Sequence, residues 1–188
     1  MSCQLSGGFS IDCGRVVGGL RSIFISEDVA VDYEISTGGF AAATDNTITI
    51  LDSAATINFY EFALKRELSS LTITQQHDSA NGTTMVEQSL TAVFQYQNAT
   101  DHINLANIAY GPRTVIVQTS NDILYVLGVG NGMETTTLTT ETGAGYGDFS
   151  GSRLEMQGRE RLTYFGTPAP TYPTASIITG MTGATLVT

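Results

Sequence analysis

The stretch TTMVEQSLTAVFQYQ at residues 83–97 alternates between apolar and polar side chains along its length. Successive side chains of a β-strand point to opposite faces, so this period of two predicts a long strand with one apolar and one polar face. The apolar face carries Val86, Gln88, Leu90, Ala92, Phe94 and Tyr96, and the polar face carries Glu87, Ser89, Thr91, Val93, Gln95 and Gln97. Such a strand covers a core with one face and meets water with the other.

A turn signal and a second β-rich segment precede this strand. Asn81-Gly82 strongly favours a tight turn between antiparallel strands. Residues 59–76 are rich in aromatic, aliphatic and threonine side chains, which predicts one long strand over this range. The two strands are therefore predicted to pair as an extended β-hairpin.

A second long hairpin is predicted from residues 134–142 and 152–163, which flank the glycine-rich loop 143–151. Its second strand has an apolar face with Leu154, Met156 and Leu162, and a polar face with Arg153, Glu155, Gln157, Arg159 and Arg161.

Shorter elements complete the predicted fold. Residues 98–109 predict a short helix with Thr100 or Asp101 as N-cap, ended by Gly111-Pro112. Further strands are predicted at residues 21–26, 29–35, 47–51, 113–119 and 122–129. The sequence thus predicts a mostly β fold, an antiparallel β-sandwich or barrel with one short α-helix and two long β-hairpins. One domain is expected over 1–188, with an N-terminal arm at about 1–20 and an extended C-terminal arm at about 166–188, whose end is a candidate strand for a neighbouring subunit.

The charge balance excludes several classes of partner. Eight Lys and Arg residues face 18 Asp and Glu residues, a net charge of −10 over 188 residues. A surface that grips nucleic acid needs a basic footprint, and an anionic membrane attracts basic segments. We therefore expect neither specific nucleic-acid binding nor membrane attachment, and no targeting segment or membrane span is expected from the sequence.

Candidate chemistry is sparse. The spacing Gly143-x-Gly145-x-Gly147 resembles part of a phosphate loop, but it joins two strands and opens no helix. A triad of His77, Asp78 and Ser79 is excluded because sequence neighbours cannot supply the opposed geometry. His102 is expected on the surface of the helix. No catalytic residue, cofactor or metal site is therefore expected.

The two cysteines lie near the N-terminus. Cys3 and Cys13 are too few for a disulfide framework or a zinc site. Two reduced thiols are the favoured interpretation, with a Cys3–Cys13 disulfide as the alternative.

The order of elements from about residue 59 to 165 resembles that of phage tail tube proteins. The motifs that carry the resemblance are FYEF at 59–62, KREL at 65–68, EQSL at 87–90, AYG at 109–111, YVLG at 125–128, GME at 132–134, the glycine-rich loop 143–151 and LEMQGRE at 154–160. The resemblance implies hexameric rings that stack into a tube, in which the two long hairpins of each subunit join one barrel around a lumen. It also implies location in the virion tail after assembly in the host cytoplasm, and contact with other tail proteins such as sheath, baseplate or terminator. Double-stranded DNA would pass through during ejection without specific binding.

Under this resemblance, two groups of residues receive candidate roles. The candidate lumen-facing residues are Glu87, Ser89, Thr91, Gln95 and Glu155. The candidate inter-ring loop contains Gly143, Gly145, Gly147 and Asp148. Arg153, Arg159 and Arg161 share a predicted face with Glu155 and are expected to pair with carboxylates of neighbouring subunits. The alternatives are another β-sandwich virion component of the baseplate or decoration type, an extracellular adhesin or lectin-like module, and a small hydrolase in a β fold.

Overall fold

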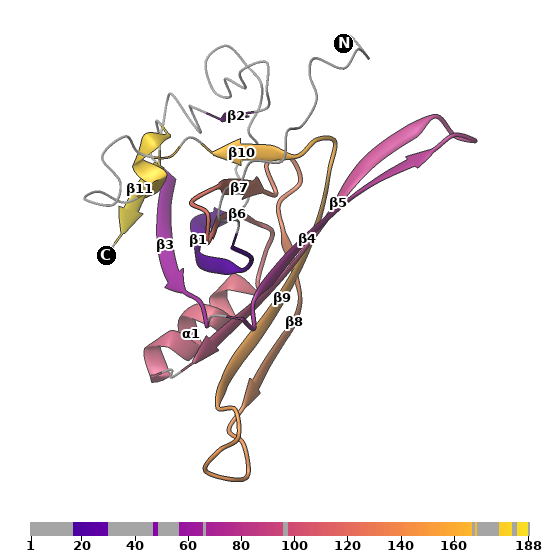
Figure 1. The fold of residues 1–188 in the computed structure, drawn as a ribbon. Helices are drawn as coiled ribbons and strands as arrows, with labels where there is room; N and C mark the ends of the chain where they lie inside the picture. The colour runs from indigo at the N-terminus through magenta and orange to yellow at the C-terminus, as the bar shows by residue number, and fades with distance from the viewer. Residues whose placement is uncertain are drawn as a thin grey trace.

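The computed structural model describes residues 17–29, 47–48, 57–65, 67–95, 98–166, 168, 177–181 and 184–187. In these residues the chain is mostly β, with two sheets and one α-helix (Figure 1). This confirms the predicted fold class. The strand expected at 29–35 lies outside the described residues beyond Val29, as do most of the strand expected at 47–51 and both cysteines.

The first sheet has seven strands, and its central strands are buried on both faces. Its order is β11 (Ala184–Val187), β3 (Ile57–Ala63), β1 (Leu20–Val29), β6 (Arg113–Thr119), β7 (Leu124–Leu127), β10 (Tyr164–Gly166) and β2 (Thr47–Ile48). The β11–β3 and β10–β2 pairs are parallel and the others antiparallel. Burial on both faces explains the continuous apolar run of β6, since neither set of its alternating side chains meets water.

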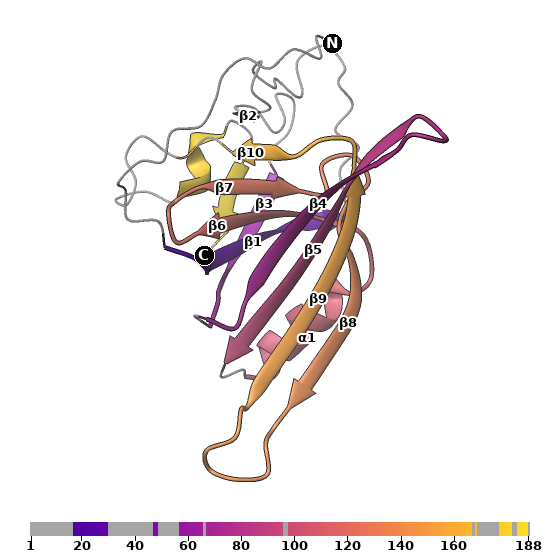
Figure 2. The same ribbon diagram turned by 45° about the vertical axis from the view of Figure 1, so that its right-hand side comes forward.

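The second sheet consists of the two long hairpins. Its order is β4 (Ser70–Asp78), β5 (Thr83–Gln95), β9 (Gly151–Glu160) and β8 (Glu134–Glu141), and every neighbouring pair is antiparallel. The Asn81-Gly82 turn is confirmed, and Gly82 has a φ of 64°, which glycine adopts without strain. The tip of the β4–β5 hairpin and the loop of the β8–β9 hairpin project past opposite ends of the sheet (Figures 1 and 2).

Helix α1 (Ala99–Ile108) follows β5 and closes one side of the core. Its N-cap is Asn98, two residues before Thr100 and three before Asp101, the two predicted N-caps. The Asn98 side chain accepts the N–H of Asp101 at 2.9 Å, and the Asp101 carboxylate accepts the N–H of Asn98 at 3.0 Å. Asn98 and Asp101, the third residue of the helix, therefore form a reciprocal capping box. It satisfies two backbone N–H groups that would otherwise have no partner within the helix.

Two clusters of buried residues lie on the two faces of the seven-stranded sheet. The first lies between the two sheets and α1, and includes Ile23, Ile25, Leu90, Ala92, Phe94, Leu105, Ile108, Val115, Val117, Leu154 and Met156. The second lies on the other face and includes Phe24, Ile48, Ile57, Phe59, Ile116, Leu124, Val126, Ile177, Ile178 and Met181. Leu90, Ala92 and Phe94 of the predicted apolar face of β5, and Leu154 and Met156 of that of β9, are therefore buried in the first cluster. Leu162 lies beyond the end of β9 and is partly exposed, and Tyr96 is outside the described residues.

The prediction of one strand over residues 59–76 is wrong. The range contains β3 and β4, which belong to different sheets. Glu67 in the connection has a φ of 66°, a left-handed conformation that ends a strand. The connection is fixed to β5, because the Lys65 N–H donates to the Val93 carbonyl and the Val93 N–H donates to Ser69 Oγ, both at 3.0 Å.

The described part of the expected C-terminal arm packs on its own chain. The 3-10 helix η1 (Ile177–Gly180) places Ile177 and Ile178 in the second core cluster, and Met181 follows them. Strand β11 pairs with β3 of the same chain, not with a neighbour. Burial of these side chains makes the segment a part of the fold.

We expect Ile178→Ala to lower the free energy of unfolding by about 2–5 kcal/mol, because the side chain is fully buried and its loss leaves a cavity. The matched control is Ile103→Ala on the exposed surface of α1, for which a change within about 0.5 kcal/mol is expected. Urea unfolding of both variants measures the difference. Equal stability of the two variants would contradict the packing of this segment.

Candidate assembly surface

The outward side of the four-stranded sheet carries a mostly polar surface, called here the polar face. Residues directly opposite each other in paired strands share a face, so the register defines its members. Its polar members are Ser70, Thr72, Thr74, Gln76 and Asp78 of β4, Thr83, Glu87, Ser89, Thr91 and Gln95 of β5, Arg153, Glu155, Gln157 and Arg159 of β9, and Glu134, Thr137, Thr139 and Glu141 of β8. Met85, opposite Gln76, is an exposed apolar residue on the same face. Each of them is at least partly exposed.

The five candidate lumen residues all lie on the polar face. Thr91 is directly opposite Glu155, and Gln95 is opposite Gly151, because β5 and β9 are neighbours. The sequence placed Glu87 and Glu155 on separate hairpins, and the β5–β9 pairing brings the hairpins into one sheet. Val93 interrupts the polar series of β5 and is buried.

Glu87 lies in a row of polar residues across three strands. Its direct neighbours are Thr74 on β4 and Arg159 on β9. Glu87 Oε1 is 3.8 Å from the Arg159 Nη2 atom, and Glu87 Oε2 accepts a hydrogen bond from Gln76 Nε2 at 3.3 Å. Arg159 therefore pairs with a carboxylate of its own chain, where the sequence had suggested a carboxylate of a neighbouring subunit.

The charges of the polar face are mixed, with an acidic excess. Five carboxylates, those of Asp78, Glu87, Glu134, Glu141 and Glu155, stand against the guanidinium groups of Arg153 and Arg159, which gives a net charge of −3. These two arginines and Arg161, which directly follows β9, are three of the eight basic residues of the chain. Two of the eight basic residues thus lie on β9, and a third directly follows it.

Both outer strands of this sheet have a free edge. Among the described residues, β4 pairs only with β5 and β8 pairs only with β9. An edge strand presents unpaired N–H and C=O groups that can pair with another chain. Because β4 and β8 run in opposite directions, the β8 edge of one copy can meet the β4 edge of another in an antiparallel pair, which is the arrangement found throughout this sheet.

The candidate inter-ring loop is held in shape by Asp148. Its Oδ2 atom accepts the N–H of Gly145 at 2.7 Å and the N–H of Ala144 at 2.9 Å. Gly143 has a φ of 68°, and a Cβ there would lie 2.6 Å from the Asp148 Cβ, so this position requires glycine. Gly147 has open space around it, and Tyr146 beside it is fully exposed.

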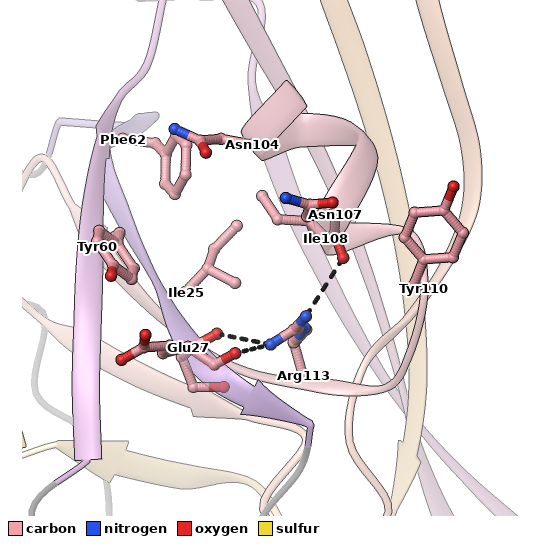
Figure 3. Close-up of a pocket in the computed structure, with 10 residues that line it drawn as sticks. Ile25, Glu27, Tyr60, Phe62, Asn104, Asn107, Ile108, Tyr110 and Arg113 are labelled. Carbon is pink, nitrogen blue, oxygen red and sulfur yellow. Dashed lines mark hydrogen bonds between the residues drawn. The ribbon is translucent and has the colours of Figure 1, made fainter. Parts of the chain in front are cut away.

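A pocket of about 480 Å³ lies between α1, β1 and β3. Arg113 forms one wall, and its guanidinium donates to the backbone carbonyls of Glu27, Ser26 and Asn107 (Figure 3). The bond to Asn107 satisfies a carbonyl near the end of α1, where a positive charge is favourable. Arg113 therefore ties the helix to β1 through its two terminal nitrogens, while its buried Nε has no hydrogen-bond partner among the described residues.

Two of the three residues of the excluded triad, His77 and Asp78, have hydrogen-bond partners at the hairpin tip. The Asp78 carboxylate accepts the backbone N–H groups of Ala80 and Asn81, which shapes the hairpin tip, and the His77 ring is 2.8 Å from Thr84 Oγ1. Among the described residues, no group of three metal-ligating side chains comes together. No helix in the described part of the chain is long and apolar enough to cross a membrane.

No protein-family model matches the sequence, and no curated protein matches it. Among solved structures, a chain of the "Virion of native gene transfer agent (GTA) particle" is similar at 9% sequence identity with a TM-score of 0.37. The match covers 56% of this chain and 88% of that chain. A TM-score at this level does not establish a shared fold.

The relation between Glu87 and Arg159 was missed by sequence reasoning. Each residue was assigned to the polar side of its own strand, but no local pattern indicates that β5 pairs with β9. The available signal was the cluster of arginines on one strand of an acidic chain. The partners of these arginines depend on which strand lies beside β9.

We expect the pKa of Asp148 to lie below the ordinary value of an aspartate, because the N–H groups of Gly145 and Ala144 stabilise the carboxylate. A carboxylate with a lowered pKa contributes its stabilisation above its unfolded pKa and loses it as the pH falls through the folded pKa. The loop should therefore keep its shape at neutral pH and loosen only in strong acid. NMR titration of the Ala144 and Gly145 amides measures this, with Asp148→Asn as the control; an ordinary aspartate midpoint would contradict the assignment.

Proposed function

We propose that this chain is a structural virion protein, a subunit of a phage tail tube, with no catalytic role. The observation that carries the proposal is the four-stranded sheet itself, which has one polar face and two edge strands, unpaired on their outer sides among the described residues, that run in opposite directions. A sheet of this kind is incomplete in a monomer, because its outer backbone groups have no partner in the described chain. Closure of the sheets of several copies into one barrel satisfies these groups.

The two faces of the sheet favour the same arrangement. In each subunit of the proposed tube, the apolar face of the four-stranded sheet is covered by the seven-stranded sheet and α1 of the same chain. The polar face is therefore left to line the water-filled lumen. Its acidic excess suits a conduit through which DNA passes without being held, because DNA is held mainly through basic contacts to phosphate. Glu87, Ser89, Thr91, Gln95 and Glu155 are the proposed lumen residues.

The projecting ends of the sheet favour stacking. The β4–β5 tip and the loop with Gly143, Gly145, Gly147 and Asp148 extend from opposite ends (Figure 2). In stacked rings, each of these ends faces the next ring. We assign the loop to the ring–ring contact because it is held in shape before assembly, which reduces the entropy lost on docking. Six-fold rings, contact with other tail proteins and DNA transit follow from the resemblance to tail tube proteins.

Electron microscopy of the purified protein tests the proposal, and we expect rings or tubes. Amide hydrogen exchange on the same sample then tests the edges. Peptides from β4 and β8 should become more protected on assembly, whereas β6, which is buried and paired on both sides, should change little. Compact monomers under all conditions would contradict the tube, and rings without added protection in β4 and β8 would contradict edge pairing.

Gly147→Val tests the loop. No atom lies within 4 Å of a Cβ at this position, so the variant should fold with unchanged stability. In a packed ring–ring contact the added side chain causes a clash, so tubes should be short or absent while rings persist. Gly18→Val is the matched control, since its Cβ also meets open space and it lies outside the hairpins. Tubes of normal length from Gly147→Val would show that the loop does not dock.

A further inference from the structure

We propose that Glu87 masks Arg159, and that this pairing prevents the polar face from holding a DNA phosphate. The inference deepens the proposed function, since it assigns to one ion pair the property that a DNA conduit needs. The group whose binding the ion pair prevents is the phosphate of double-stranded DNA. Removal of the carboxylate should create a phosphate contact.

The exposure of the two side chains defines their roles. The Arg159 side chain is 72% exposed, so a ligand on the polar face can reach its guanidinium. The Glu87 side chain is 33% exposed and is held from its other side by Gln76 Nε2. The carboxylate is thus the fixed member of the pair, and the arginine is the accessible one.

The surroundings place further negative charge near Arg159. Glu87, Glu134 and Arg159 line one shallow hollow of about 380 Å³. Glu134 is opposite Gln157, two residues from Arg159 on the same face of β9. A phosphate that approaches Arg159 therefore meets two carboxylates. Arg153, the other arginine of the face, has Glu155 two residues away on the same strand face.

Phosphate binding by a free arginine at this place would be favourable. A guanidinium group donates two parallel hydrogen bonds to a phosphate, and each such contact releases counterions from DNA. Every subunit of a tube repeats the same residue, so even a weak contact would be multiplied along the DNA. The ion pair weakens this contact because the Glu87 carboxylate, 3.8 Å from Arg159 Nη2, offsets the charge of the guanidinium and repels the phosphate.

Fluorescence anisotropy with a labelled DNA duplex measures the DNA affinity of the dissociated chain, that is, of subunits that are not assembled into rings or tubes. We expect Glu87→Gln to bind the duplex more tightly than the wild-type chain. One new phosphate contact steepens the dependence of log K on log salt by about 0.9, so the affinity ratio of variant to wild type should grow about 3.5-fold from about 200 to 50 mM salt. Detectable binding by Glu87→Gln under conditions where the wild-type chain shows none would equally support the proposal.

Two further variants separate masking from net charge. Glu87→Gln with Arg159→Gln should return to wild-type binding, because the contact is lost. Glu61→Gln removes one negative charge from exposed β3 on the other sheet and should leave binding unchanged. Equal gains from Glu61→Gln and Glu87→Gln, a gain that survives Arg159→Gln, or no binding by Glu87→Gln at the lowest salt would each overturn the proposal.

The DNA-binding comparison of these variants does not depend on tube formation. If the wild-type chain forms no rings or tubes under the electron microscope, the tail tube function fails. The comparison of variants on the dissociated chain still decides whether Glu87 masks Arg159. Thermal unfolding of each variant confirms that the fold is retained, as expected for substitutions of partly or fully exposed strand residues.

Discussion

The two-residue alternation of β5 is the constraint on which the rest of the molecule depends. Val86, Leu90, Ala92 and Phe94 are buried on one side of the strand, while Glu87 and its polar neighbours lie on the other. A slip of one residue against either neighbour would exchange the two faces and expose the core side chains to water. The register of β5 with β4 and with β9 is therefore fixed by burial, and this register places Arg159 opposite Glu87.

The seven-stranded sheet supports this arrangement because its central strand β6 is buried on both sides. Val115 and Val117 of β6 pack toward the four-stranded sheet, and Ile116 between them packs toward the cluster with Ile178 and Met181. The C-terminal segment thus covers the sheet on its far side. With the large sheet enclosed between two layers, the long four-stranded sheet has only one face to bury, which leaves the other face polar.

Much of the fold could be predicted from local patterns. The alternation of residues 83–95, the Asn81-Gly82 turn and the glycine-rich loop define both long hairpins without knowledge of their neighbours. The break within residues 59–76 could not be predicted, because both halves are rich in β-forming residues. The break is stabilised by two hydrogen bonds of the Val93 backbone, whose carbonyl accepts from the Lys65 N–H and whose N–H donates to Ser69 Oγ. The burial of Ile178 likewise depends on packing against residues far away in the sequence.

The candidate surface shows the same division between local and non-local information. Alternation alone assigns Glu87, Thr91 and Glu155 to polar sides of strands, and the structure places all three on one face. Which carboxylate meets which arginine depends on the β5–β9 pairing, which joins residues more than 50 positions apart along the chain. The pattern of each strand shows which charged residues lie on its polar side, but it does not show which residues of other strands lie beside them.

The energetics of the Glu87–Arg159 pair argue for a role other than stability. An ion pair between exposed side chains contributes about 0–1 kcal/mol, and salt screens it further. Hydrophobic burial along β5 already fixes the register, so the pair is not needed to specify the fold. What the pair does change is the field at the surface, because an exposed guanidinium on its own would attract phosphate strongly. In the proposed tube, a wall of uncompensated carboxylates would repel DNA, and a wall of free arginines would hold it. A net charge of −3 made from intermixed charges lies between these extremes, and it lets the polyanion move through a hydrated lumen without a fixed contact.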